Sequence, residues 1–304
     1  MRPVTAETIK DLRDVPSFPA VYAAALTPSR ARRSRRREPA LPSLAYRVRG
    51  VRIHAERARD VDHLLGGAAT DLVHPAVLHI LAFPVSLALM ARDEFPFPLL
   101  GVVHLRNQLL QHRSVHVGES VDVECRVRDL RPHRKGWTFE AVATVLDQDG
   151  AIIATDVSTY LAKGDSPAAE ATGADSPSRR REFVAPRPTG RWSLGADTGR
   201  RYAAVSGDAN PIHMSGLTAR AFGFPRAIAH GMYTAARALT EARPDLSRPL
   251  RWDVEFDAPV TLPGTVLVSY EDRADGSTTC VGWRPGRDGK PDRRCFEVAV
   301  TPLG

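Results

Sequence analysis

The feature that most constrains the fold is a break in composition near the middle of the chain, with similar patterns on either side of it. Residues 164–188 are rich in Pro, Ala, Ser and Gly and nearly lack large apolar side chains. Such a segment cannot bury enough surface to fold by itself. We therefore predict an N-terminal extension over 1–45, a linker over 164–188, and two folded halves, 46–163 and 189–304.

Both halves follow the same order, in which a helix-like apolar stretch precedes strand-like sequence. The helix-like stretches are Val77–Met90, which contains the unfavourable Pro84, and Met232–Ala242. Polar and apolar residues alternate in the sequence that follows each stretch, and Asp-Gly pairs at 149–150 and 288–289 predict hairpin turns. One helix followed by antiparallel strands predicts an α+β unit whose sheet curls around a mostly buried helix.

Composition places the chain among ordinary globular proteins and argues against several other classes. The 304 residues are 43% hydrophobic and 25% charged. No apolar run approaches the roughly 20 residues of a membrane helix, so we expect no membrane insertion. The first residues lack the apolar core of a secretory signal, and Cys125, Cys280 and Cys295 have no CxxC spacing. These features predict reduced thiols, a cytoplasmic location and no structural metal site.

The formal net charge of +7 comes largely from two arginine-rich runs, Arg30–Arg37 and Arg179–Arg181. Such a run can bind phosphate or nucleic acid, or it can form a solvated segment. Neither run has the interleaved aromatic residues with which proteins stack nucleic-acid bases. We therefore expect solvated segments and no nucleic-acid partner.

The clearest chemical pattern lies between Tyr202 and Met232, in the sequence YAAVSGDANPIHMSGLTARAFGFPRAIAHGM. Asp208 and His213 are five positions apart, across a turn that contains Pro211 and that we expect not to be regular helix. Such a turn can direct both side chains at one water molecule. A carboxylate accepts a hydrogen bond from water, and an imidazole exchanges a proton near neutral pH. The pair therefore indicates acid–base chemistry in which either residue can be the base.

This segment resembles the MaoC-like dehydratases, also called hydratase 2 or R-specific enoyl-CoA hydratases, which have the hotdog fold. Their motif is an aromatic, an aliphatic and a small residue, followed by Gly-Asp-x-Asn-Pro-aliphatic-His. A His-Gly-Met sequence then opens the central helix. The residues that match are Tyr202, Val205, Ser206, Gly207, Asp208, Asn210, Pro211, Ile212 and His213, and then His230, Gly231 and Met232.

The resemblance implies an α+β double hotdog, in which each half is an antiparallel sheet wrapped around a central helix. It implies that Asp208 and His213 are the catalytic pair. The backbone N–H of Gly231 would stabilise an enolate at the start of a helix, where unpaired donors favour negative charge. The residues expected to support the site are Ser206, Gly207, Asn210, Pro211, Tyr202 and His230.

The N-terminal half lacks this motif. Its histidines at 63, 74 and 79 are interpreted as structural residues. In double-hotdog relatives, one half often has lost its catalytic residues and leaves room for a long acyl chain. The resemblance therefore implies that 46–163 is a non-catalytic half that accommodates the acyl chain.

The implied reaction belongs to fatty acid metabolism and is the reversible conversion of a (3R)-3-hydroxyacyl thioester to a trans-2-enoyl thioester and water. The substrate would be carried by coenzyme A or by acyl carrier protein, whose charges also suit the arginine runs. No metal or redox cofactor is expected, and the protein would be a monomer or a homodimer. Two alternatives stay open: a thioesterase, which is another hotdog activity, and a non-catalytic module that binds acyl thioesters.

Overall fold

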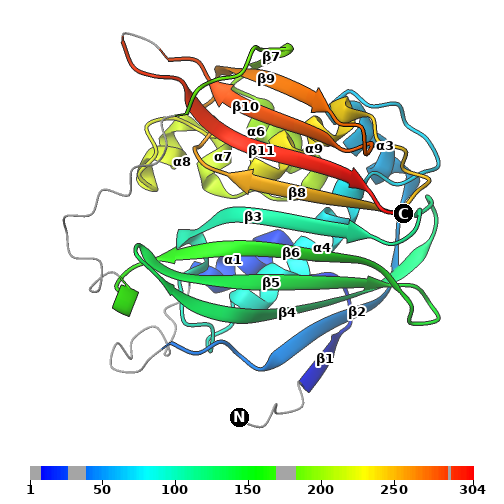
Figure 1. Cartoon of the computed structure of the whole chain (residues 1–304). Helices are drawn as coiled ribbons and strands as arrows, with labels where there is room; N and C mark the ends of the chain where they lie inside the picture. The colour runs from blue at the N-terminus through cyan, green and yellow to red at the C-terminus, as the bar shows by residue number, and fades with distance from the viewer. Residues whose placement is uncertain (1–7, 27–38, 169–182, 287–288) are drawn as a thin grey trace. The chain divides into compact units, whose positions relative to one another are not determined.

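The computed structural model describes residues 8–26, 39–168, 183–286 and 289–304 (Figure 1). Both arginine-rich runs, residue 288 of the second Asp-Gly pair and most of the predicted linker therefore lie outside the described residues. Contacts divide the chain into two compact units. The first contains residues 1–53, 78–105 and 118–176, and the second contains 54–77, 106–117 and 177–304. The predicted boundaries at 45, 163 and 188 stay predictions.

The first unit is built on a sheet with the strand order β1-β2-β4-β5-β6. Strand β1 runs parallel to β2, and the other pairs are antiparallel. Along β4 and β5 the side chains alternate between deeper and shallower burial, as in a sheet with one face on a core. The strands are β1 (Thr8–Leu12), β2 (Leu44–Arg52), β4 (Ser120–His133), β5 (Gly136–Leu146) and β6 (Ile152–Lys163).

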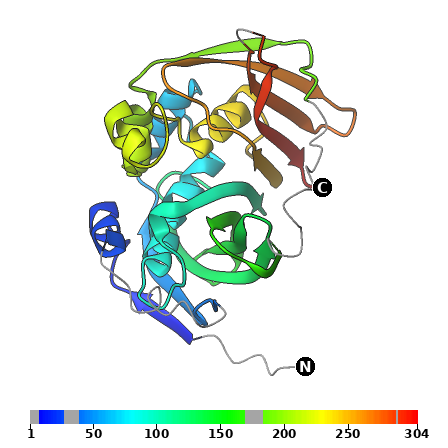
Figure 2. The same cartoon turned by 90° about the vertical axis from the view of Figure 1, so that its left-hand side faces the viewer.

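The central helix of this unit is α4 (Pro75–Met90), which begins in the second unit's segment and continues into the first. The predicted helix over Val77–Met90 is therefore confirmed, with Pro84 inside it. The helix is apolar on all sides, as expected of one that is buried all round. Figure 1 shows α4 and α1 (Phe18–Leu26) behind β4 to β6, and Figure 2 shows how strongly these strands curl.

The second unit contains a sheet with the order β3-β8-β11-β10-β9-β7, in which neighbouring strands are antiparallel. The order β7-β9-β10-β11 repeats the order β2-β4-β5-β6 of the first unit, as the similar patterns of the two halves predict. The 3₁₀ helix η1 (Leu99–Gly101) leads into β3, which enters this unit at Arg106. The strands are β3 (Val102–Gln111), β7 (Gly190–Leu194), β8 (Leu250–Phe256), β9 (Gly264–Asp272), β10 (Thr278–Arg284) and β11 (Arg293–Pro302).

The central helix of the second unit is α9 (Gly231–Ala242), which confirms the helix predicted over Met232–Ala242. It packs against β8, β10 and β11. Helix α3 (Ala55–Leu65) comes from the N-terminal half of the sequence, yet it packs against α9 and α6 (Thr198–Ser206). The second unit therefore includes a helix that the sequence places among the residues of the first half.

The connection from α6 to α9 carries two further helices, α7 (Pro211–Met214) and α8 (Gly216–Ala221). The turn between Asp208 and His213 is not one regular helix, as expected, because residues 207–210 are not helical. The expectation did not include the short helix α7, whose first residue is Pro211. A proline is tolerated at that position, where its missing N–H would have no intrahelical acceptor.

Two sequence-based expectations about the chain as a whole can be checked in the described residues. No helix among them is both long and apolar enough to cross a membrane. Cys125, Cys280 and Cys295 are all buried and free, as predicted for reduced thiols.

Candidate active site

The site begins where α6 ends, at a glycine that reverses the chain. Gly207 has a φ of 84°, a left-handed conformation that favours glycine. The Ser206 hydroxyl donates to the Tyr202 carbonyl oxygen at 2.9 Å and accepts from the Asp208 N–H at 3.2 Å. Ser206 and Gly207 thus set the direction in which Asp208 leaves the helix.

Asp208 and His213 are held by a series of short hydrogen bonds around Asn210. Asp208 Oδ1 accepts from the Asn210 N–H at 3.1 Å, and Asn210 Oδ1 accepts from the Ile212 N–H at 3.3 Å. Asn210 is the N-cap of α7, and Pro211 follows as its first residue. The His213 N–H donates to the Asn210 carbonyl oxygen at 3.0 Å. The motif residues therefore form a hydrogen-bonded turn that carries both Asp208 and His213.

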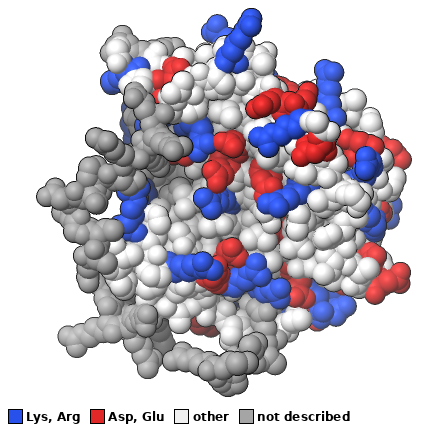
Figure 3. All heavy atoms as spheres, in the orientation of Figure 1, with Lys and Arg blue, Asp and Glu red and all other residues white. Residues whose placement is uncertain are grey.

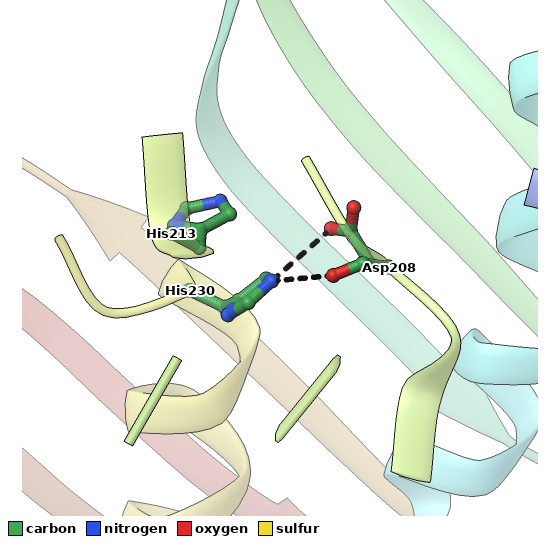
Figure 4. Close-up of side chains that lie close together, drawn as sticks. All are labelled: Asp208, His213 and His230. Carbon is green, nitrogen blue, oxygen red and sulfur yellow. Dashed lines mark hydrogen bonds and ion pairs between the residues drawn. The ribbon is translucent and has the colours of Figure 1, made fainter. Parts of the chain in front are cut away.

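The third member of the site is His230, which directly precedes α9 (Figure 4). Its ring stacks on that of His213, with 3.6 Å between centroids and 28° between planes. Its Nε2 lies 2.9 Å from the Asp208 carbonyl oxygen and 3.6 Å from Asp208 Oδ2. The three side chains are buried, and one ligand atom from each lies within 4.8 Å of the others. The structure thus brings together the predicted pair and a residue predicted only to support it.

The proton on His213 can be placed from its backbone partner. His213 Nδ1 lies 2.9 Å from the carbonyl oxygen of Ile228, which can only accept a hydrogen bond. Nδ1 therefore carries the proton, and Nε2 presents a lone pair. Burial, together with the neighbouring His230, lowers the pKa of His213 to about 3. His213 is thus a neutral hydrogen-bond acceptor at physiological pH.

His230 and Tyr202 are buried beside His213 and Asp208. Burial lowers the pKa of His230, although the nearby Asp208 opposes the shift. Because His230 Nε2 donates to a carbonyl oxygen, Nδ1 is its unprotonated nitrogen, and this buried atom has no hydrogen-bond partner among the described residues. The Tyr202 ring lies 4.8 Å from the His230 ring, and burial raises the pKa of its hydroxyl. Both pKa shifts favour the uncharged forms of these side chains.

Gly231 is the first residue of α9, where the N–H groups of the first turn have no intrahelical acceptor. A Cβ atom at this position would lie 2.8 Å from Cε1 of Phe256. The position therefore has no room for a side chain unless the Phe256 ring moves. The backbone N–H of Gly231 is the oxyanion donor expected from the sequence, and that role stays a prediction.

Sequence reasoning missed two residues that hold His213. Ile228 supplies the carbonyl that fixes its tautomer, and a backbone acceptor leaves no trace in residue type. Gly199 lies so close to α7 that a Cβ atom there would be 2.1 Å from the His213 carbonyl oxygen. Nothing in the sequence signalled Gly199, because no helix was predicted before the motif.

Aspartate and histidine side chains also bind transition metals, so we asked whether Asp208, His213 and His230 could coordinate one ion. The free nitrogens, His213 Nε2 and His230 Nδ1, belong to stacked rings, and each lone pair lies in the plane of its own ring. The ring centroids are 3.6 Å apart and the two planes differ by 28°. Both cannot point at one ion at the distance of about 2.0–2.1 Å that zinc requires. The donor set suits hydrogen bonding to water better than metal coordination.

Three comparisons with known proteins agree with one another. Residues 174–281 match the family model described as MaoC like domain. The chain is 34% identical to 3-hydroxyacyl-thioester dehydratase X of Mycobacterium tuberculosis over 217 residues, which cover 71% of this chain and 73% of the relative.

The similar solved structures have the same fold. The crystal structure of HtdX from Mycobacterium tuberculosis has a TM-score of 0.72 at 29% identity and covers 84% of this chain and 99% of its own. A MaoC-like dehydratase from Phytophthora capsici has a TM-score of 0.65 at 17% identity, covering 85% of this chain and 94% of its own. A further Mycobacterium tuberculosis protein, described as a double hotdog, has a TM-score of 0.53 at 17% identity and covers 84% of this chain and 93% of its own. The fold is thus an α+β double hotdog.

Proposed function

Because the chain belongs to the MaoC-like dehydratase family, we propose that it catalyses the reversible dehydration of (3R)-3-hydroxyacyl thioesters to trans-2-enoyl thioesters. The observation that carries this proposal is the position of the Asp208 carboxylate beside the unprotonated Nε2 of His213, close to the start of α9. The relative named a 3-hydroxyacyl-thioester dehydratase supports the same reaction.

In the hydration direction, Asp208 and His213 Nε2 hold one water molecule. The water oxygen forms a bond to C3 of the enoyl thioester, and the C2–C3 double bond supplies electrons to the thioester carbonyl. The Gly231 N–H stabilises the resulting enolate oxygen. The proton taken from the water is returned to C2, so the catalytic pair finishes the cycle in its starting state. Dehydration follows the same steps in reverse.

We assign the proton transfer to Asp208 and the orientation of the water to His213. Protonating His213 would create a cation in a buried site, and burial already holds its pKa at about 3. Protonating Asp208 removes a buried charge instead. Its carboxylate is also fixed by the Asn210 N–H, which keeps it near the water position.

The partners follow from the reaction. The substrate is an acyl thioester of coenzyme A or of acyl carrier protein, and we propose that residues 46–163 accommodate its acyl chain. Lys and Arg side chains lie among Asp and Glu on the face in Figure 3, a pattern that gives no support to a nucleic-acid interface there. We further propose that the enzyme is cytoplasmic, that it is a monomer or a homodimer, and that it needs no cofactor.

The direct test is the hydration of crotonyl-CoA and trans-2-dodecenoyl-CoA, followed by the loss of the conjugated-thioester absorbance. We expect the wild type to form the (3R) product and Asp208→Asn to be inactive. A thioesterase would instead release free thiol from saturated acyl-CoA. If the wild type hydrates neither the CoA esters nor the matching carrier-protein esters, the proposal is wrong.

A further inference from the structure

Two arginines of the second unit converge on one hydroxyl group. Arg226 Nη2 donates to Thr261 Oγ1 at 2.8 Å, and Arg284 Nη1 lies 3.3 Å from the same atom. Arg226 Nη1 also donates to the Pro263 carbonyl oxygen at 3.2 Å. Thr261 is buried, whereas Arg226 is exposed and Arg284 is half-buried. Their shared acceptor therefore holds two guanidinium groups close together near the surface.

The charges of this pair are not neutralised. Within the part of the chain that the structure describes, neither Arg226 nor Arg284 forms an ion pair with an acidic residue. Other arginines of the unit do: Arg237 pairs with Glu241, Arg251 with Asp253, and Arg294 with Asp257. Arg284 also lies against the buried thiol of Cys295, which is a neutral group. Two like charges on one neutral acceptor favour the binding of an anion.

The segment that carries Arg226 also contacts His213, the proposed catalytic histidine. Ile228 follows Arg226 by two residues, which span about 7 Å of extended chain. Its carbonyl oxygen accepts from His213 Nδ1, and its backbone forms a bridge with Thr261, the residue that both arginines contact. An anion bound by the two arginines would thus lie next to the strand-like segment that positions His213.

We propose that Arg226 and Arg284 bind a phosphate group of the substrate's thioester handle, an inference that rests on the proposed function. Guanidinium groups suit phosphate because their planar N–H donors match two of its oxygens. Coenzyme A and acyl carrier protein share the phosphate on the pantetheine arm, and coenzyme A adds the phosphates of its nucleotide. The site anchors the handle while the acyl group occupies the catalytic residues.

The test compares the Arg226→Gln/Arg284→Gln double variant with Arg251→Gln, a control that removes one positive charge from an ion pair elsewhere in the unit. Three substrates carry the same crotonyl group: crotonyl-CoA, crotonyl-4′-phosphopantetheine and crotonyl-pantetheine, which has no phosphate. For crotonyl-CoA we expect KM to rise on the order of tenfold in the double variant, the effect of losing charged hydrogen bonds. We expect kcat to stay within about twofold, and no change for crotonyl-pantetheine or in the control.

The pattern across substrates identifies the phosphate. A KM increase with both phosphorylated substrates assigns the site to the phosphate of the pantetheine arm, and an increase with crotonyl-CoA alone assigns it to the nucleotide phosphates. An equal loss with crotonyl-pantetheine would overturn the proposal, because the arginines would then act through the fold.

Calorimetric binding of free coenzyme A separates this inference from the proposed function. If the wild type turns over thioesters but the double variant binds coenzyme A as tightly as the wild type, only the phosphate site is wrong. If no thioester reacts while coenzyme A binding weakens in the double variant, the site stands and the proposed reaction fails.

Discussion

In the first unit a histidine and a carboxylate meet inside the core, whereas in the second they meet at the ends of two helices. His79 lies within α4, and its Nδ1 is 2.6 Å from Oδ2 of Asp156 on β6. Both side chains are buried, and the His79 ring stacks on Phe83 of the same helix. Asp208 and His213 instead occupy the connection between α6 and α9.

The two connections explain this difference. Residues 66–74 join α3 to α4, whereas residues 207–230 join α6 to α9 and include α7 and α8. The strand order around them is the same in both units. The comparison shows that the repeated sheet and central helix supply a scaffold, while the longer connection supplies the reactive side chains. A histidine–carboxylate pair is therefore not evidence of catalysis unless it lies where a substrate can reach it.

The largest effect that separates the two pairs is expected from their carboxylates. Asp208→Asn and His213→Ala should each lower kcat for crotonyl-CoA hydration by at least about a hundredfold, the scale of a lost acid–base group. Asp156→Asn should leave kcat within about twofold of the wild-type value, because Asp156 is buried in the core of the first unit and takes no part in the proposed reaction. Circular dichroism should show that the Asp208 and His213 variants stay folded. A similar loss of kcat in Asp156→Asn would break the distinction between the halves.

A smaller effect is expected at the start of α9. Gly231→Ala should lower kcat by about tenfold, because its methyl group would press on Phe256 and shift the N–H that faces the enolate. Replacing Phe256 by Leu in the same protein should restore part of the activity by making room. Steady-state kinetics of the single and double variants test this. No change in kcat for Gly231→Ala would remove Gly231 from the proposed mechanism.

The pair in the first unit should affect stability instead. His79→Phe removes one partner of this buried hydrogen bond, and Asp156→Asn replaces its charged acceptor by a neutral amide. We expect each change to cost about 2 kcal/mol in the free energy of unfolding. Urea denaturation of both variants measures this cost. Unfolding midpoints equal to that of the wild type would show that the buried pair contributes nothing to the core.

The smallest expected change is in the pH dependence. The pKa of His213 is lowered to about 3, so its neutral, active form persists above that pH and is lost only as the pH falls through about 3. The kcat/KM profile between pH 5 and 8 should therefore contain no acid limb from His213. An acid limb near the ordinary histidine pKa of about 6.5 that disappears in His213→Gln would contradict this assignment.

Much of the local structure could be predicted from the sequence, because it depends on residues that are neighbours in the chain. The apolar stretch ending at Met90 and the run from Met232 to Ala242 identified α4 and α9. The motif from Tyr202 to His213 identified the residues that the structure brings together with His230. The one-turn helix α7 was missed, because a proline that usually breaks a helix can also begin one.

The sequence by itself determined the repeated order of elements and the residue types of the site, since periodicity and turn chemistry are local properties. Only the tertiary structure decided that α3 packs in the second unit, that His230 stacks on His213, and that Ile228 holds the His213 proton. These contacts join positions far apart in the chain or use backbone atoms, which every residue carries. Residue identity cannot encode them without the fold.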